Sequence, residues 1–72
     1  MNEVNAKFYV LFNVDNMKFV YGYSNDSCTY SSLAHRAKEY QSKERAEATR
    51  NRLKEKDKLI VKEVNVIVCN IP

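Results

Sequence analysis

Apolar and polar residues alternate through two neighbouring stretches near the start of the chain, KFYVLFNV and MKFVYGY. Alternation with a period of two, combined with β-branched and aromatic residues, is typical of β-strands. The dipeptide Asp15-Asn16 lies between the two stretches, and both residue types tolerate the positive φ of a two-residue hairpin loop. Residues 7–23 therefore predict a β-hairpin.

The predicted loop fixes which residues share each face of this hairpin. One face would carry only apolar and aromatic pairs, which are Val14–Met17, Phe12–Phe19, Val10–Tyr21 and Phe8–Tyr23. The other face is mixed and would carry Tyr9, Leu11 and Asn13 against Lys18, Val20 and Gly22. We expect the uniformly apolar face to be the inner one, packed on the helices, and the mixed face to be the outer one.

Helical spacing appears after the polar turn cluster SNDS at residues 24–27. Within TYSSLAHRAKEY, residues Leu33, Ala37 and Tyr40 have the i, i+4, i+7 spacing of one helical face. A serine at position 31 or 32 would cap this segment. The pattern predicts a short helix or a single helical turn.

The main helix is predicted from residue 43 to residue 55 or 56. Ser42 is a suitable N-cap, and Glu44 lies in the first turn, where the helix dipole favours a carboxylate. The apolar stripe is narrow, so the helix can lie close to a sheet. It consists of Ala46, Thr49 and Leu53, with the stem of Arg50 beside them.

The last β-rich run is LIVKEVNVIVCNI at residues 59–71. Its alternation is imperfect, because Lys62 interrupts one parity and Glu63 and Asn65 interrupt the other. Either a bulge near Lys62-Glu63 switches the parity, or the strand is buried on both sides in the middle of the sheet. We favour a central or pairing strand that leaves apolar residues on the outer face.

Together the elements predict one α+β domain over residues 1–72, with a two-layer ββ(α)αβ architecture. A three-stranded antiparallel-type sheet would carry its helices on one face, and the first strand would lie between the other two. A chain of 72 residues buries only about 60% of its unfolded surface. We therefore expect a free energy of unfolding of roughly 3–5 kcal/mol.

The sequence offers little catalytic chemistry, so we expect no enzyme, no cofactor and no metal. Its single glycine, Gly22, argues against phosphate-binding loops, which use several glycines. Cys28, Cys69 and the single histidine His35 supply at most three metal ligands. A Cys28–His35 dyad lacks a third group to orient it, and we expect both cysteines to be reduced thiols.

No apolar run approaches the ~20 residues that a membrane helix needs. The first ten residues, MNEVNAKFYV, also lack the layout of a secretory signal. We therefore expect a cytoplasmic protein without a membrane partner.

The mixed face of the hairpin and one parity of the last strand leave apolar side chains without a helix to cover them. An apolar patch of several hundred Å² on a small domain marks an interface. We expect a partner or dimer interface on this outer face, formed by Tyr9, Leu11, Val20, Ile67 and Cys69. A homodimer is expected, because a second copy would also stabilise a marginal core.

Nucleic-acid binding is the alternative interpretation, since the formal net charge is +3. Arg45, Arg52 and Lys56 lie on one flank of the predicted helix and could follow a phosphate backbone, with Tyr9 as a stacking residue. An acidic flank on the opposite side of the helix argues against this interpretation. It consists of Glu44, Glu47, Asn51 and Glu55, of which Asn51 is uncharged.

Three stretches carry a resemblance that spans nearly the whole chain. They are the opening FYVLFNVDNMKFVYGY, the segment with Thr29, Ala37-Lys38-Glu39-Tyr40-Gln41-Ser42 and Ala46, and the closing VKEVNVIV. Together they resemble small uncharacterised proteins encoded by bacteriophages and mobile elements of Gram-positive hosts. The resemblance implies binding to a host or bacterial protein, as anti-CRISPR and other anti-defence inhibitors do. It transfers no site residues, because the shared positions are packing positions.

Overall fold

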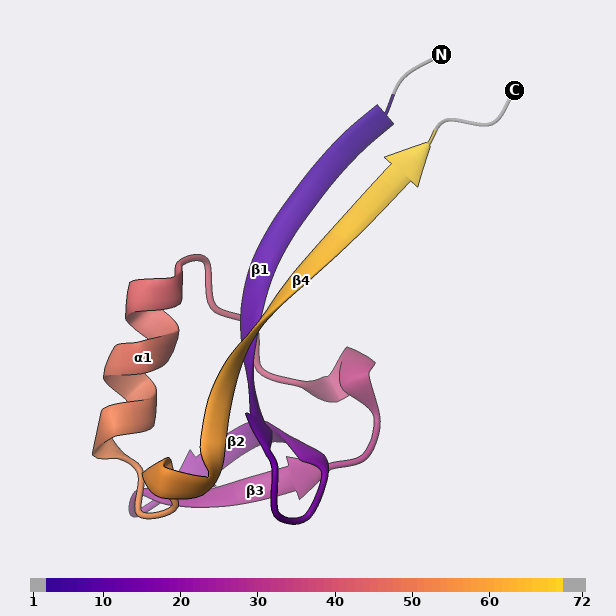
Figure 1. Cartoon of the computed structure of the whole chain (residues 1–72). Helices are drawn as coiled ribbons and strands as arrows, with labels where there is room; N and C mark the ends of the chain where they lie inside the picture. Colours follow the sequence, from indigo (N-terminus) through magenta and orange to yellow (C-terminus); the bar gives the residue numbers. More distant parts are fainter. Residues whose placement is uncertain (1–2, 70–72) are drawn as a thin grey trace.

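The computed structural model describes the backbone of residues 3–69 and the side chains of residues 6–66. The described residues form four strands, one α-helix and two 3₁₀ turns. In chain order these are β1 (Glu3–Asn13), β2 (Lys18–Ser24), β3 (Ser27–Ser31), η1 (Ala34–Arg36), α1 (Lys43–Arg52), η2 (Lys56–Lys58) and β4 (Leu59–Cys69). The strands form one sheet in the order β3-β2-β1-β4, in which every neighbouring pair is antiparallel (Figure 1).

The predicted α+β class is confirmed, but the sheet has four strands rather than three. The extra strand, β3, takes up the start of the stretch predicted as a short helix. Asn25 and Asp26 have φ of 52° and 63°, the positive values that two-residue hairpin turns require. The chain therefore reverses directly into β3, where Thr29 and Tyr30 suit a strand. Only residues 34–36 form a helical turn.

The loop between β1 and β2 is longer than the predicted two residues. Asn13 organises it, because its Oδ1 accepts hydrogen bonds from the N–H groups of Asp15 (2.8 Å) and Asn16 (3.2 Å). The N–H of Met17 donates to the carbonyl oxygen of Asn13 at 2.9 Å. Met17, rather than the predicted dipeptide, has the positive φ, of 59°. The buried Asn13 side chain thus takes the place of a tight turn.

The predicted register is correct next to this loop, where Phe12 pairs with Phe19. Farther along, β1 and β2 separate, and the predicted pairs Val10–Tyr21 and Phe8–Tyr23 do not form.

The chain that follows η1 enters the gap between the two strands. The N–H of Tyr9 donates to the carbonyl oxygen of Tyr40 at 2.9 Å, and the N–H of Tyr40 donates to the carbonyl oxygen of Tyr9 at 2.8 Å. The N–H of Lys38 donates to the carbonyl oxygen of Val20 at 3.0 Å. Residues 38–40 thus form hydrogen bonds with backbone groups of β1 and β2 that the predicted hairpin would have paired with each other.

The last strand, β4, pairs with β1 without interruption from Asn13–Leu59 to Glu3–Cys69. The alternative of a bulge near Lys62-Glu63 is therefore wrong. The first strand does lie between the second and last strands, as predicted. Since β4 pairs with β1 alone, it is an edge strand of the sheet and not a central one.

The helix α1 covers the face that was predicted to be the outer one. Ser42 caps it as predicted, since its Oγ accepts a hydrogen bond from the N–H of Arg45 at 3.2 Å. The helix ends at Arg52, earlier than predicted. The core cluster between helix and sheet consists of Leu11, Val20, Tyr40, Ala46, Leu53 and Leu59. The face assignment from the sequence was thus reversed.

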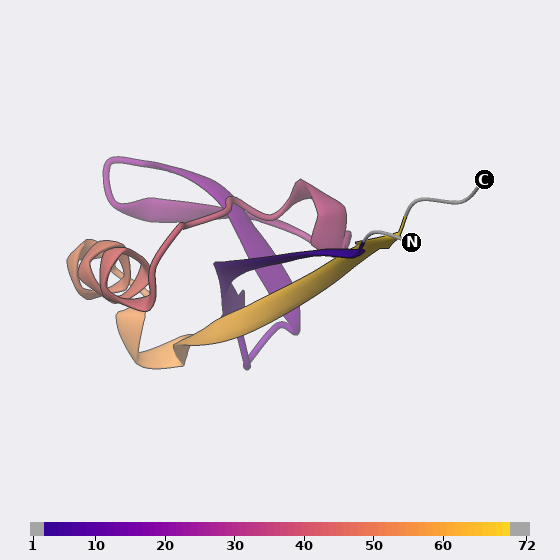
Figure 2. The ribbon, with the colours of Figure 1, turned by 90° about the horizontal axis from the view of Figure 1, so that it is seen from above.

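On the N-terminal side of Tyr9, β1 pairs with β4 alone. Residues 3–8 of β1 and 64–69 of β4 form a two-stranded ribbon, hereafter the arm, which projects away from α1 and from the β2–β3 hairpin (Figures 1 and 2). The molecule is accordingly elongated, with extents of 47 × 24 × 19 Å. Its radius of gyration is 13.8 Å, whereas a compact chain of this length would have about 11 Å.

Candidate functional site

The sheet face opposite α1, hereafter the open face, carries the even-numbered residues of β1 and β4. Because Phe12 lies opposite both Phe19 and Ile60, these residues share one side of the sheet. The described side chains of the open face are Ala6, Phe8, Val10, Phe12, Phe19, Tyr21, Ile60, Lys62, Val64 and Val66. This set contains no carboxylate, and its single charge is the Lys62 ammonium.

Large apolar side chains on the open face remain in contact with solvent. Tyr21 is 48% exposed, Ile60 42% and Val66 37%. Tyr21 lies where the register between β2 and β3 shifts. Further exposed apolar side chains come from the loops, namely Val14, Met17 and Leu33.

The turn η1 covers only part of this face. It contacts β2, and Figures 1 and 2 show it on the opposite side of β1 from α1. Ala37, which follows the turn, is buried, as are Val10 and Phe12 of β1. The middle of the open face is therefore closed, while both ends of it stay accessible.

A small aromatic cluster with a positive charge lies on the open face. The rings of Phe12 and Phe19 meet edge to face, with their centroids 5.0 Å apart. The Nζ of Lys62 lies 4.9 Å from the centroid of Phe12, within the range of a cation–π contact. An apolar surface of this kind, with one cation and no carboxylate, favours an apolar partner surface that carries an acidic group.

Two residues of the predicted sheet interface, Leu11 and Val20, are buried. Leu11 is 0% exposed and Val20 1%, and both belong to the core. Tyr9 is partly buried against the same core, and its hydroxyl donates to Oε1 of Glu63 at 3.4 Å. Leu11 and Val20 therefore pack beneath α1 instead of lying on an outer face, and a partner contact through Tyr9 stays a prediction. The side chains of Ile67 and Cys69, the other two predicted interface residues, lie outside the described side chains.

The predicted basic flank is exposed to solvent. Arg45 and Arg52 lie on α1, and Lys56 begins η2. Glu44 and Glu47 are exposed on the same helix. The helix surface therefore has mixed charge, which is typical of a solvated face.

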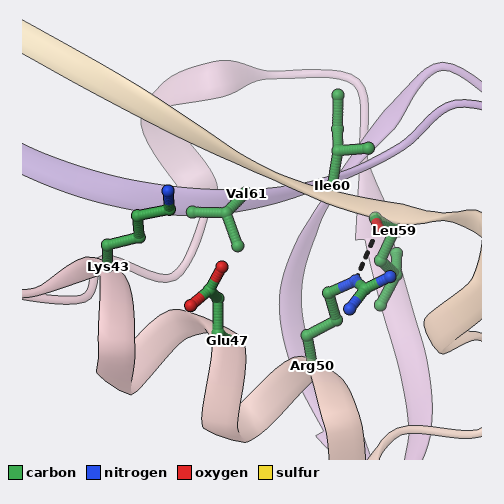
Figure 3. Close-up of a pocket in the computed structure, with 6 residues that line it drawn as sticks. All are labelled: Lys43, Glu47, Arg50, Leu59, Ile60 and Val61. Carbon is green, nitrogen blue, oxygen red and sulfur yellow. Dashed lines mark hydrogen bonds between the residues drawn. The ribbon is translucent and has the colours of Figure 1, made fainter.

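An open groove of ≈ 310 Å³ lies between α1 and the start of β4 (Figure 3). Its lining residues are Lys43, Glu47, Arg50, Leu59, Ile60 and Val61. The guanidinium of Arg50 is already engaged, because its Nε donates to the carbonyl oxygen of Leu59 at 2.7 Å. Arg50 thereby fastens α1 to the sheet, and the other charged residues at the groove are Lys43 and Glu47.

The Cys28 thiol has the opposite character from a nucleophile. Burial raises the pKa of this thiol most, hydrogen bonding with Tyr30 lowers it by less, and the Glu55 carboxylate raises it again. Burial also raises the pKa of Tyr30 to about 12, and the Tyr30 hydroxyl accepts a hydrogen bond from Nδ2 of Asn13 at 2.8 Å. A nucleophilic cysteine needs a lowered pKa, whereas the pKa of Cys28 is raised. Cys28 is therefore a protonated thiol at the edge of the core, in a polar cluster with Tyr30 and Asn13. His35 lies exposed on η1.

Among the residues that the structure describes, no group of three or more histidine, cysteine, aspartate or glutamate side chains is arranged to hold a metal ion. No helix within the described part of the chain is long and apolar enough to cross a membrane.

Fold and surface define a small α+β protein with one helix on a four-stranded antiparallel sheet. Comparison of the chain with protein-family models, with curated proteins and with solved structures found no match.

Proposed function

We propose that this chain is a non-enzymatic protein-binding module that recognises its partner through the open face of the sheet. The observation that carries the proposal is the exposure of Tyr21, Ile60 and Val66 on one side of one sheet. Ile60 and Val66 lie on either side of the closed middle of this face, and exposed apolar surface of this extent on so small a domain marks an interface. Tyrosine is also one of the residue types enriched in binding hot spots.

The resemblance to phage and mobile-element proteins makes a host defence protein or another host factor the first partner to test. An inhibitor of this kind needs no chemistry of its own, since occupation of a functional surface is sufficient. The partner surface would be apolar with at least one carboxylate, which would pair with Lys62.

Affinity capture from a Gram-positive host lysate, followed by titration with the purified captured protein, tests this proposal. We expect Tyr21→Ser and Ile60→Ser each to weaken binding at least tenfold, because each removes exposed apolar surface. Arg52→Ser on α1 is the matched control and should bind normally. Thermal unfolding must show that all three variants fold. Loss of binding in the control with retention in the sheet variants would contradict the proposal, as would failure to capture any specific protein.

Nucleic-acid binding through Arg45, Arg52 and Lys56 is the competing outcome of the same experiment. It predicts that Arg52→Ser weakens binding to mixed duplex and single-stranded DNA. It also predicts a steep fall in affinity with salt, because phosphate contacts release counterions. The burial of Phe12 and the mixed charge of α1 favour the protein partner.

A further inference from the structure

The free edge of β1 in the arm presents backbone groups in a defined pattern. Tyr9 exchanges both of its backbone hydrogen bonds with Tyr40, on the side of β1 away from β4. In a strand, alternate residues direct their backbone groups to the same side. Glu3, Asn5 and Lys7 therefore also direct their N–H and C=O groups away from β4. Within the described residues, no hydrogen bond joins these backbone groups to another segment.

The arm is a sheet of only two strands, and the edge of β1 in it is unpaired. A two-stranded ribbon is marginally stable in water, whereas three or more strands are independently stable. A strand edge with unpaired N–H and C=O groups is also a template for pairing with another chain. The total accessible surface is 5320 Å², about 700 Å² more than the roughly 4,600 Å² of a compact monomer of this mass.

We propose that a second copy of this chain completes the arm by pairing antiparallel along this edge of β1, with Asn5 opposite Asn5 of the second copy. The five residues EVNAK carry the proposal, because their charges are arranged symmetrically about Asn5. In this register Glu3 of each copy lies opposite Lys7 of the other. The Lys7 side chain is exposed, and its Nζ lies 3.9 Å from Oε1 of Glu63 in its own copy. Directly opposed residues of antiparallel strands lie on one face, where opposite charges attract.

Symmetry and hydrogen bonding limit the possible registers without selecting one. Two identical antiparallel strands are related by a two-fold axis normal to the sheet that passes midway between the strands. The outward N–H and C=O groups belong to odd-numbered residues, and the registers centred on Val4, Asn5 and Ala6 all oppose odd residues to odd residues, so the opposition of Glu3 to Lys7 is what selects the register centred on Asn5. Each copy then gains the hydrogen bonds of Glu3, Asn5 and Lys7, and pairing stops at Tyr9, which Tyr40 already occupies.

The free edge of β4 does not offer the same complementarity. Its outward backbone groups also belong to odd-numbered residues, since β1 and β4 pair with even residues opposite even residues. Self-pairing centred on Glu63 would oppose two carboxylates. Self-pairing centred on Asn65 would place Glu63 opposite Ile67. Neither register pairs opposite charges, so the charge pattern favours the β1 edge.

The proposed pairing leaves the rest of the molecule unobstructed. The combined arm would be a four-stranded sheet in the order β4-β1-β1-β4, with one α1-covered body at each end. The two Tyr9 positions would lie about 27 Å apart along the strands at ~3.4 Å per residue. Both open faces remain available, so the dimer is independent of the binding function proposed above.

Two charge-reversal variants test the pairing. Their self-association is measured by analytical ultracentrifugation from about 1 µM to about 1 mM, the range in which a small interface dissociates. Glu3→Lys places lysines opposite lysines, and Lys7→Glu places glutamates opposite glutamates. We expect each variant alone to raise the dimer dissociation constant about tenfold or more. An equimolar mixture of the two should form a heterodimer, because opposite charges then face each other again.

Two proline variants separate this edge from the other one. Asn5→Pro removes an N–H that points away from β4, so it should abolish self-association while the β1–β4 pairing survives. Asn65→Pro is the matched control, because it removes an outward N–H from β4 at the position opposite Lys7, and it should leave the dimer intact. A wild-type monomer throughout the concentration range would overturn the proposal. So would a mixture of the charge variants that does not associate, or a dimer that Asn65→Pro disrupts and Asn5→Pro does not.

Discussion

Leu11→Ala is the substitution that separates the two assignments of the sheet faces most sharply. If the mixed hairpin face were the exposed one, removing this side chain would weaken partner binding and leave stability nearly unchanged. The structure places Leu11 at 0% exposure in the core cluster beneath α1. We therefore expect the substitution to act on folding.

The magnitude follows from the burial. Replacing leucine by alanine removes three carbon atoms, which corresponds to about 2.4 kcal/mol of lost transfer free energy. The cavity left between α1 and the sheet adds to this, so the expected loss is about 3 kcal/mol or more. A domain of this size has roughly 3–5 kcal/mol of total stability. The variant should therefore keep about 2 kcal/mol of stability or less, so that its urea unfolding begins without a folded baseline.

Ile60→Ala is the matched control, since it removes the same number of carbon atoms from the open face. Ile60 is 42% exposed, and solvent can fill the space that the side chain leaves. The expected loss is about 1 kcal/mol. Urea unfolding followed by far-ultraviolet circular dichroism measures both variants, and the slope of about 1 kcal/mol per M turns these losses into separate midpoints. An Ile60→Ala variant that loses as much stability as Leu11→Ala, or more, would refute the face assignment.

Three further substitutions check other parts of the structure. Asn13→Ala should cost about 2 kcal/mol in urea unfolding, because it removes the acceptor of the loop N–H groups and leaves the Tyr30 hydroxyl without its donor; a loss below about 0.5 kcal/mol would count against the loop geometry. Ser42→Ala should cost about 1 kcal/mol through the lost N-cap, and an unchanged midpoint would show that the cap is dispensable. In a Cys69→Ser background, alkylation of folded Cys28 should be slow at neutral pH, and its rate should rise with a midpoint above the ordinary thiol value of 9.0. Because folding raises this pKa, the contribution of the thiol to stability is complete below the unfolded-state pKa and is lost as the pH rises through the folded-state value; a midpoint below 9.0 would contradict the burial.

The elements with a strong local signal were predictable one by one. The capping serine and the buried stripe of the helix are set by interactions within a few residues, and both predictions are confirmed at Ser42, Ala46 and Leu53. The strands containing Phe12, Phe19 and Val61 are likewise where alternation placed them. Strand β3 was not predicted, because the helical spacing of Leu33, Ala37 and Tyr40 is the longer pattern in this stretch. The β-forming residues Thr29 and Tyr30 occupy only two positions of it.

The candidate site could not be derived in the same way. Both faces of the hairpin contain large apolar side chains, so alternation identifies the two faces without saying which one a helix covers. That choice depends on contacts across the chain, in which Leu11 packs in one cluster with Leu53 and Leu59. Tyr21 lies at an irregularity in the register between β2 and β3, for which the sequence carried no recognised signal.

The sequence by itself determined the α+β class, the helix with its cap, and the strand character of the β-rich stretches at residues 7–23 and 59–71. Each of these depends on neighbours close along the chain. The tertiary structure decided the side of the sheet on which α1 packs, the separation of β1 from β2 around Tyr40, and the projecting arm. These features depend on residues tens of positions apart competing for the same backbone groups and the same apolar surface. Local propensity cannot rank such competitors, since their free energies differ only once the whole chain is packed.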